Sequence, residues 1–312
     1  MTTLESALIS ELGEKLVRNE PLKNHVQIRV GGVADYFYVA DSLSDLAHSV
    51  SLAHSLGLPY IVLGGGTNVI PSDGGFPGLV IKNMSSNIMF SPESSTVIVD
   101  SGVVLSKLIN LAAGRDLGGL EFLVGVPGTV GGSLYNNAGD CKDAIGDRVR
   151  SITLLMPKDG RVAIVKHDPS WMHFSSFSSI LKEWEKKDNR PVLLTATLQL
   201  AMRRKDEILR LIHFYNKQHS LNYPSEGFVT GEYFKPISLE PVVMARSIID
   251  LLPTKRIKSN TVCFAKENHN CLVNRKGAMA KELREVADAV KALAKEEKEI
   301  ILEEMVEYIG RW

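Results

Sequence analysis

A run of three glycines carries the first pattern suited to chemistry. Gly64-Gly65-Gly66-Thr67-Asn68 follows directly on the apolar residues Tyr60–Leu63. The backbone N–H groups of such a turn can converge on an anion such as a phosphate, and the threonine and asparagine add side-chain donors. The same residues also suit a tight turn that needs positive φ, so both interpretations stay open here. A Walker loop is excluded because no Lys-Ser or Lys-Thr follows the glycines, and no helix opens after them as a GxGxxG motif requires.

A second glycine-rich segment, Gly125-Val-Pro-Gly-Thr-Val-Gly-Gly-Ser, is more specific. Pro127 stiffens its entry, and the glycines let the backbone lie against a flat or phosphate-bearing ligand. We expect Gly131 to combine this close approach with positive φ. Asn136, Asn137 and Gly139 follow on what reads as the end of a strand. Two such segments, each after an apolar strand, suit a dinucleotide with a pyrophosphate and a ring system.

The composition of the 312 residues excludes several classes of function. Lys and Arg together number 36, and so do Asp and Glu, so the basic excess typical of nucleic-acid-binding proteins is missing. Three scattered cysteines suit neither a disulfide framework nor a zinc site, and the histidines show no metal-ligand spacing. No apolar stretch is long enough to span a membrane, and the first residues lack the regions of a signal peptide. We therefore expect a cytoplasmic protein without a metal site.

Hydrophobic periodicity predicts the elements that must position the glycine segments. Helices are expected over residues 4–16, 41–56, 103–115, 202–221 and 278–297. Strands are expected as a pair around Gly31-Gly32 within 28–40, at 60–63, 78–81 and 95–100, as a hairpin over 148–156 and 160–166, at 191–201 and over 301–310. Residues 174–179 read as a solvated loop. The helix over 202–221 marks a boundary, because the character of the chain changes after it.

Three stretches resemble the UDP-N-acetylenolpyruvoylglucosamine reductases (MurB), which are FAD enzymes of peptidoglycan synthesis. They are LGGGTNVI, GLEFLVGVPGTVGGSLYNNAG and IRVGGVADYFYVA, and the resemblance continues with Gly231-Glu-Tyr-Phe-Lys, Asn270-Cys-Leu-Val-Asn and residues 302–310. It covers nearly the whole chain. The implied fold class is α+β: a two-subdomain FAD-binding fold of the vanillyl-alcohol oxidase/MurB type over residues 1–203, followed by a C-terminal α/β substrate domain over residues 204–312.

The resemblance also implies how FAD is held. The pyrophosphate is cradled by Gly64, Gly65, Gly66, Thr67 and Asn68, and the adenosine and flavin halves are approached by Pro127, Gly128, Thr129, Val130, Gly131, Gly132, Asn137, Ala138 and Gly139. Backbone donors hold a dianionic pyrophosphate without requiring net positive charge. We expect FAD to be bound non-covalently, because no His or Cys lies within the two glycine segments, although Cys141 lies close to the second.

In the resembled family NADPH reduces the flavin, which delivers hydride to the enolpyruvyl double bond of a UDP-sugar, and a serine donates the completing proton. An arginine and a glutamate bind and polarise the substrate carboxylate, because the reduction builds enolate-like negative charge. The resemblance therefore implies a small-molecule UDP-sugar substrate for this chain, and it leaves the oligomeric state open.

The chain departs from the family pattern at the catalytic positions. Glu232 stands where the Gly-Ser-x-Phe-Lys motif has its serine, and Phe177 stands where Phe-x-Tyr-Arg-x-Ser has its arginine. Met305 falls on the terminal glutamate, unless the alignment slips by one place and makes Glu304 that carboxylate. The candidate catalytic residues are therefore Glu232, as a buried carboxyl that keeps its proton, Lys235 and Glu304.

These departures leave three functions open. The first is an FAD-dependent, NADPH-using reductase of a UDP-sugar enolpyruvyl ether with altered catalytic residues. The second is a catalytically degenerate paralogue that binds FAD or a nucleotide sugar in a regulatory role. The third is a flavin oxidoreductase that acts on another substrate.

Overall fold

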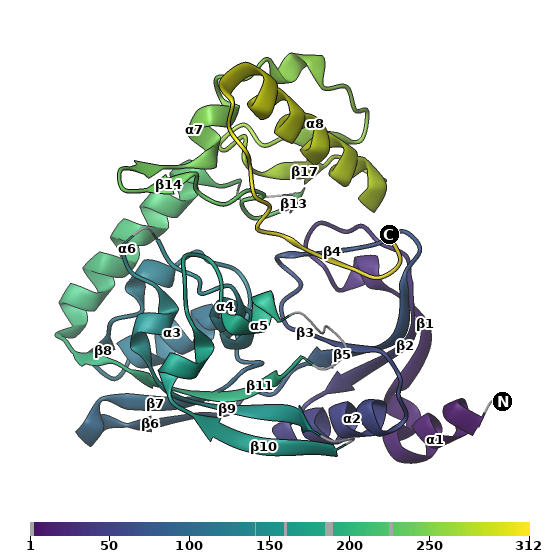
Figure 1. The fold of residues 1–312 in the computed structure, drawn as a ribbon. Helices are drawn as coiled ribbons and strands as arrows, with labels where there is room; N and C mark the ends of the chain where they lie inside the picture. Colours follow the sequence, from purple (N-terminus) through teal and green to yellow (C-terminus); the bar gives the residue numbers. More distant parts are fainter. Residues whose placement is uncertain (1–2, 141, 159–160, 185–189, 225–226) are drawn as a thin grey trace. The chain divides into compact units, whose positions relative to one another are not determined.

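The computed structural model describes residues 3–140, 142–158, 161–184, 190–224 and 227–312, which form two compact units (Figure 1). Unit 1 consists of Met1–Glu20, Ala34–Gly65 and Gly78–Lys217. Unit 2 consists of Pro21–Val33, Gly66–Pro77 and Gln218–Trp312. The chain therefore contributes two N-terminal segments to the unit that holds its C-terminal part. Each unit is described on its own below.

The first sheet of unit 1 has the strand order β1-β2-β5-β3. Its strands are β1 (Leu16–Pro21), β2 (Val33–Ala40), β5 (Phe76–Asn83) and β3 (Tyr60–Leu63), and its helices are α1 (Thr3–Leu12) and α2 (Leu43–Ser55). Strand β3 runs parallel to β5, with Leu63 opposite Lys82. Apolar side chains of α2 such as Leu46 and Val50 are fully buried with Leu79 and Ile81 of β5. This packing fixes the carboxyl end of β3, where the first glycine segment begins.

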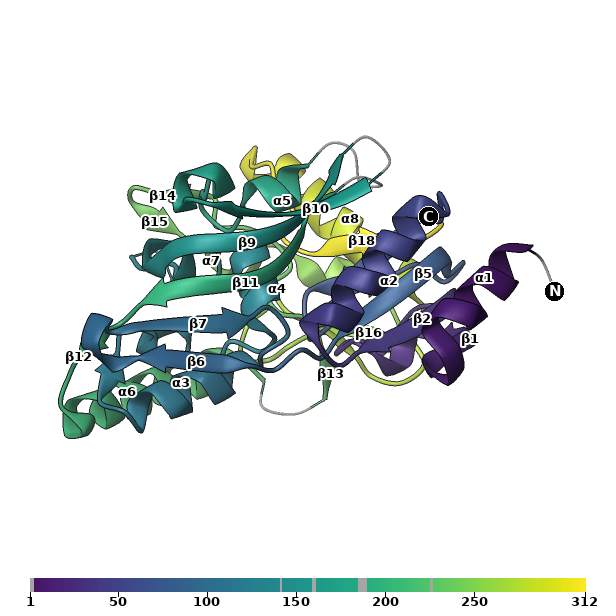
Figure 2. The ribbon, with the colours of Figure 1, turned by 90° about the horizontal axis from the view of Figure 1, so that it is seen from below.

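The second sheet of unit 1 has the order β10-β9-β11-β7-β6, and its neighbouring strands are antiparallel (Figure 2). Its strands are β6 (Ile88–Ser91), β7 (Thr96–Asp100), β9 (Val149–Lys158), β10 (Arg161–His167) and β11 (Val192–Gln199). The main core of the unit lies between this sheet and α3 (Leu105–Ala113), α4 (Val130–Tyr135) and α5 (Ile180–Glu183). A short pair, β8 (Leu117–Gly118) and β12 (Ala201–Met202), precedes α6 (Lys205–Asn222).

Unit 2 is built on the three-stranded sheet β13-β17-β16. Its elements are β13 (Phe228–Val229), β14 (Ser238–Leu239), β15 (Val242–Val243), α7 (Ala245–Ile249), β16 (Val262–Phe264), β17 (Leu272–Asn274) and α8 (Ala280–Lys298). Helix α8 buries an apolar stripe that includes Leu283, Val286 and Val290 and exposes its charged face. The residues at the end of α6, from Gln218 on, also belong to this unit.

The two N-terminal segments of unit 2 complete its structure. Strand β4 (Val69–Pro71) pairs in parallel with β18 (Glu307–Ile309) near the end of the chain. The Asp73 carboxylate accepts hydrogen bonds from the backbone N–H groups of Ala280 and Lys281, each at 2.9 Å, and so caps the first turn of α8. Residues far apart in the sequence thus form one core.

Most of the predicted elements are confirmed. The five expected helices are present as α1, α2, α3, α6 and α8, and the hairpin is present as β9 and β10. The strand expected before Gly31-Gly32 is wrong, because residues 28–32 lie outside any strand. Arg29 and Gly31 have positive φ there, and Ile28 is buried in the core of unit 2. The closing strand is shorter than expected and spans only Glu307–Ile309.

Candidate functional site

Gly64 of the first glycine segment contacts the second glycine segment within unit 1. Strand β3 ends at Leu63, and Gly64 then lies so close to Thr129 that a Cβ on Gly64 would stand 2.5 Å from the threonine Oγ1. Thr129 is the N-cap of α4, and its Oγ1 accepts a hydrogen bond from Gly132 N at 3.3 Å. Any side chain on Gly64 would push the N-terminal turn of α4 away, so these glycine positions set the contact between the segments.

The second half of the first glycine segment belongs to unit 2. Gly66 has φ +68° and packs against the backbone of His25, and its carbonyl accepts a hydrogen bond from Gln27 N at 2.9 Å. The backbone N–H groups of Gly65 and Gly66 have no acceptor among the described residues. Positive φ agrees with a tight turn, and consecutive N–H groups without acceptors agree with an anion nest. The turn fits a pyrophosphate on this ground.

Gly131 needs to be glycine for a reason other than its backbone angle. It lies inside α4, where its φ is negative, so the expectation of positive φ is wrong. Positive φ instead occurs at Gly125 and Gly128, before the helix begins. A Cβ on Gly131 would stand 2.9 Å from both the Cβ and the carbonyl oxygen of Ser101. Gly131 therefore lets α4 pack directly on the backbone that follows β7.

The backbone N–H groups at the start of α4 already have acceptors within the chain. Val130 N donates to Val103 O at 2.9 Å, and Gly131 N donates to Ser101 O at 2.8 Å. With Gly132 N bonded to Thr129 Oγ1, this segment offers a ligand a close backbone surface rather than unused donors at these three positions. Its predicted contact with the adenosine and flavin halves of FAD stays a prediction.

Asn137, which was expected to approach FAD, joins two loops of unit 1. Its Nδ2 donates to Ser175 O at 2.8 Å, and its Oδ1 accepts from Gly146 N at 3.0 Å. The interpretation of residues 174–179 as a solvated loop is wrong for Ser178 and Ser179, which are buried. Ser175 and Ser178 close a tight turn that carries Phe177 at φ +56°. Ala138 and Gly139 follow Asn137 directly in the chain, whereas Cys141 lies outside the described residues.

Glu232 is the most deeply buried carboxylate among the candidate catalytic residues. Its side chain belongs to unit 2, and the residue is only 7% exposed. Tyr223 Oη donates to Glu232 Oε1 at 3.0 Å, and Asn268 Nδ2 donates to the same oxygen at 3.2 Å. Burial raises the pKa of the Glu232 carboxyl above its ordinary value, and the two hydrogen bonds and nearby Arg246 oppose this shift. The site therefore favours a carboxyl that keeps its proton to higher pH than an exposed glutamate does.

The motif around Glu232 lies against the C-terminal segment of the chain. Met305 N donates to Tyr233 O at 2.7 Å, and Lys235 N donates to Glu303 O at 2.8 Å. Asn68 of the first glycine segment joins them, because its Nδ2 donates to Met305 O at 2.9 Å. Three sequence motifs that were singled out separately are thus neighbours within unit 2.

The two other candidate catalytic residues are engaged in ion pairs. Lys235 Nζ lies 3.2 Å from Glu303 Oε2, and Glu304 Oε1 lies 2.8 Å from Lys291 Nζ. The Glu304 side chain is 20% exposed, so it is more buried than that of its neighbour Glu303, which is 71% exposed. Both Lys235 and Glu304 thus lie beside the Glu232 motif while their charges are already paired.

Asn270 holds this motif in place, and its removal tests how far the motif depends on it. The buried Asn270 side chain accepts from Phe234 N and donates to Phe234 O, both at 2.9 Å. Asn270→Ala should lower the free energy of unfolding by about 2–4 kcal/mol, because it leaves both backbone groups without a partner. Chemical denaturation measures this change, and the exposed Asn260→Ala serves as the matched control. Equal stability of the two variants would contradict the prediction.

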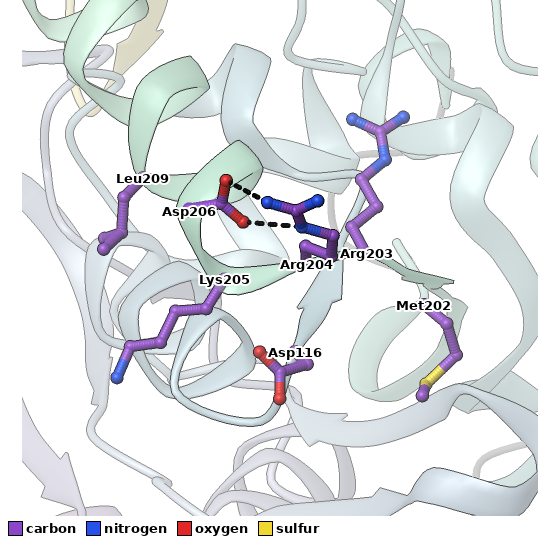
Figure 3. A pocket seen from close by; sticks show the side chains of 7 residues that line it. All are labelled: Asp116, Met202, Arg203, Arg204, Lys205, Asp206 and Leu209. Carbon is purple, nitrogen blue, oxygen red and sulfur yellow. Dashed lines mark hydrogen bonds and ion pairs between the residues drawn. The ribbon is translucent and has the colours of Figure 1, made fainter.

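A surface hollow of unit 1 contains none of the candidate residues (Figure 3). It is lined by Asp116, Met202, Arg203, Arg204, Lys205, Asp206 and Leu209. Figure 3 shows the Arg204 guanidinium paired with the Asp206 carboxylate. This hollow is therefore separate from the candidate site.

Comparisons with known proteins identify the family of this chain. The family described as FAD binding domain matches residues 34–166. A UDP-N-acetylenolpyruvoylglucosamine reductase of Geotalea uraniireducens is 31% identical over 97% of this chain and 97% of its own length. The chain belongs to the UDP-N-acetylenolpyruvoylglucosamine reductase family. A relative of that name from Clostridium tetani is also 31% identical, over 98% of this chain and 96% of its own.

A solved structure of the reductase family supports the fold. The enzyme of Thermus caldophilus superposes with a TM-score of 0.75 at 26% identity, covering 95% of this chain and 98% of its own. The expected α+β fold with a two-subdomain FAD-binding part is therefore confirmed. Among the described residues, no helix has the length and apolar character needed to cross a bilayer, and no cluster of His, Cys, Asp or Glu is arranged for a metal ion.

Sequence reasoning missed two residues that shape this reductase-family site. Tyr223 and Asn268 set the environment of Glu232, because each donates a hydrogen bond to its carboxylate. Burial raises the pKa of the Tyr223 phenol, so Tyr223 stays a neutral hydrogen-bond donor throughout the physiological range. No local pattern in the sequence marks it.

Proposed function

We propose that this chain binds FAD non-covalently and reduces the enolpyruvyl ether of UDP-N-acetylglucosamine, with NADPH as the source of hydride, in the cytoplasm. The observation that carries the proposal is the buried Glu232, at the proton-donor position of the family, beside Asn68 and the C-terminal segment. Membership of the reductase family supports the reaction class. The altered residues make turnover slower than in a family member with the usual serine, arginine and glutamate.

The proposed FAD site is built from the two glycine segments. The N–H groups of Gly65 and Gly66 would face the pyrophosphate, and the backbone from Gly128 to Gly132 would lie against the rest of the molecule. Bound FAD would supply the transfer of hydride from NADPH to the substrate. The division into an FAD-binding domain over residues 1–203 and a substrate domain over residues 204–312 is part of this proposal.

Glu232 would supply the proton. Its Oε1 accepts two hydrogen bonds, which leaves Oε2 to carry the proton that burial stabilises. As hydride adds to one carbon of the enolpyruvyl double bond, the Oε2–H bond breaks and the proton forms a C–H bond at the other carbon. The Glu232 carboxylate left behind is reprotonated from solvent, and Tyr223 and Asn268 stabilise it meanwhile.

Substrate binding is where the chain is weakest. Phe177 replaces the arginine that clamps the substrate carboxylate, and the charges of Lys235 and Glu304 are paired within unit 2. A missing electrostatic stabiliser costs about 10²–10³-fold in rate. We therefore expect turnover of the enolpyruvyl ether at least a hundredfold below an intact family enzyme. This same loss favours the second candidate, a flavin- or nucleotide-sugar-binding paralogue with a regulatory role, and a third, a flavin oxidoreductase acting on another substrate.

We expect the purified protein to be yellow and to hold FAD without a covalent bond. The physical reason is the pair of glycine segments, which place N–H donors without acceptors and close-packed backbone together. The visible absorbance of the flavin, measured before and after denaturation and ultrafiltration, tests this. Colourless protein that does not take up FAD would reject the proposal.

Anaerobic titration separates the three candidates. Bleaching of the flavin by NADPH, followed by reoxidation with the UDP-sugar enolpyruvyl ether, supports the reductase. Bleaching without reoxidation by that compound favours another substrate. Flavin that NADPH does not reduce favours the paralogue without this activity.

A further inference from the structure

Lys82 lies where the first glycine segment begins. It is the penultimate residue of β5. It pairs with Leu63, the last residue of the parallel strand β3. Ligands of parallel sheets bind beyond the carboxyl ends of the strands. The register therefore places Lys82 at the end of the sheet where Gly64 and Gly65 begin their turn.

The Lys82 ammonium group touches this turn directly. Its Nζ donates a hydrogen bond to the carbonyl oxygen of Gly64 at 2.5 Å. The residue is half-buried, and among the described residues it forms no ion pair. Burial lowers the pKa of the Lys82 ammonium, with no neighbouring charge to oppose the shift. A cation in this position is costly unless an anion accompanies it.

Other donors lie next to Gly64. The Gly65 N–H has no acceptor among the described residues, and Thr129 Oγ1, which stands over Gly64, still has its own hydrogen to donate. Lys82 uses one of its three N–H donors on the Gly64 carbonyl, so two remain. A cation, an amide and a hydroxyl at the end of two parallel strands form a recognition site for a phosphate group.

We propose that Lys82 is a further FAD-binding residue, whose ammonium group pairs with the pyrophosphate held at the Gly64-Gly65 turn. This inference rests on the proposed binding of FAD, and it adds a side-chain charge to a site otherwise made from backbone donors. It explains how a chain with no net charge offers a local cation to a dianion. It also explains why a lysine is kept half-buried without a carboxylate partner.

The dissociation constants of FAD and riboflavin for apoprotein test the proposal. Lys82→Met should weaken FAD roughly tenfold to hundredfold, which is the effect of losing a charge-assisted hydrogen bond. Riboflavin, which has no phosphate, should bind wild type and Lys82→Met equally, and Lys82→Arg should keep most of the FAD affinity. The exposed Lys107→Met in α3 is the matched control and should bind FAD as wild type does.

The pH dependence of FAD affinity distinguishes an electrostatic role of Lys82 from a purely structural role. Pairing with an anion favours the charged form, so FAD binding raises the lowered pKa of Lys82. The affinity of wild type for FAD should be constant below the pKa of Lys82 in the apoprotein and fall as the pH rises through it. Lys82→Arg should remove this decline, because arginine stays charged.

Two outcomes would overturn the proposal. Equal FAD affinity of wild type and Lys82→Met would show that the ammonium does not meet the pyrophosphate. Equal losses of FAD and riboflavin, with a lowered melting temperature of the apoprotein, would show that Lys82 only supports the turn. Wild type that binds neither flavin would reject the proposed function itself, a result distinct from both.

Discussion

Glu232→Gln should lower turnover of the enolpyruvyl ether by about 10²–10⁴-fold, which is the usual contribution of a positioned proton donor. Glutamine has nearly the same shape and keeps the hydrogen bonds from Tyr223 and Asn268 to its carbonyl oxygen, but it has no acidic proton to give. FAD affinity should not change. Steady-state kinetics with purified variants measure the effect, and Glu285→Gln on the exposed face of α8 is the matched control.

The pH dependence of turnover gives an independent test of this role. Burial raises the pKa of Glu232, so the acid form persists above the ordinary range of a carboxyl. Wild-type activity should be present below this raised pKa and should fall as the pH rises through it. Glu232→Gln should show no such decline in its residual rate. Wild-type turnover that does not fall as the pH rises, or a variant as fast as wild type, would exclude Glu232 as the proton donor.

A double substitution distinguishes a reductase that lacks the usual substrate-binding arginine from a protein that no longer uses this substrate. Phe177→Arg together with Glu232→Ser introduces the residue types that the sequence resemblance implies for these positions. Turnover should rise if the protein still accepts the UDP-sugar, because a cation and a proton donor of the usual types are then both present. Phe177 has positive φ, which strains the backbone equally with phenylalanine or arginine at this position. The backbone conformation therefore does not disfavour the arginine variant. No gain in turnover would favour the regulatory paralogue or another substrate.

Gly131→Val should abolish FAD binding and leave unit 2 folded. The new Cβ would stand 2.9 Å from the Cβ and carbonyl oxygen of Ser101, and neither can yield without moving β7 or α4. Displacing α4 also moves Thr129 away from Gly64, so both glycine segments lose their arrangement. The strain should destabilise unit 1 by about 1–3 kcal/mol, as other overpacked sites do.

Flavin content and a denaturation curve measure this effect together. Gly114→Val is the matched control, because a Cβ there would meet its nearest atoms only at 3.6 Å, at the exposed end of α3. It should retain flavin. A Gly131→Val protein with wild-type flavin occupancy would show that the segment does not need this close packing.

Local patterns in the sequence predicted the elements that depend on local forces. The 3.6-residue period of α8 is such a case, because the helix buries one face and exposes the other. The strand expected before Gly31-Gly32 failed for the opposite reason. Ile28 is apolar because it enters the core of unit 2 from a loop, and positive φ at Arg29 prevents a strand.

The candidate site divides in the same way. The glycine segments and Glu232 were visible in the sequence, because their residue types are unusual for their places in a recognised pattern. Tyr223, Asn268 and Lys82 were not, since each acts through one contact with a residue distant in the chain. The reason for glycine at position 131 was also misjudged, because the contact with Ser101 is set by packing that no local rule describes.

The two N-terminal segments of unit 2 delay the folding of this unit during synthesis. Strand β4 is synthesised well before β18, the strand with which it pairs in parallel. Asp73 likewise waits for the first turn of α8. Strand β4 and Asp73 therefore stay without these partners until β18 and α8 have been synthesised. A fragment that begins after α6 would lack the strand and the cap that these segments supply, so unit 2 cannot be obtained by simple truncation.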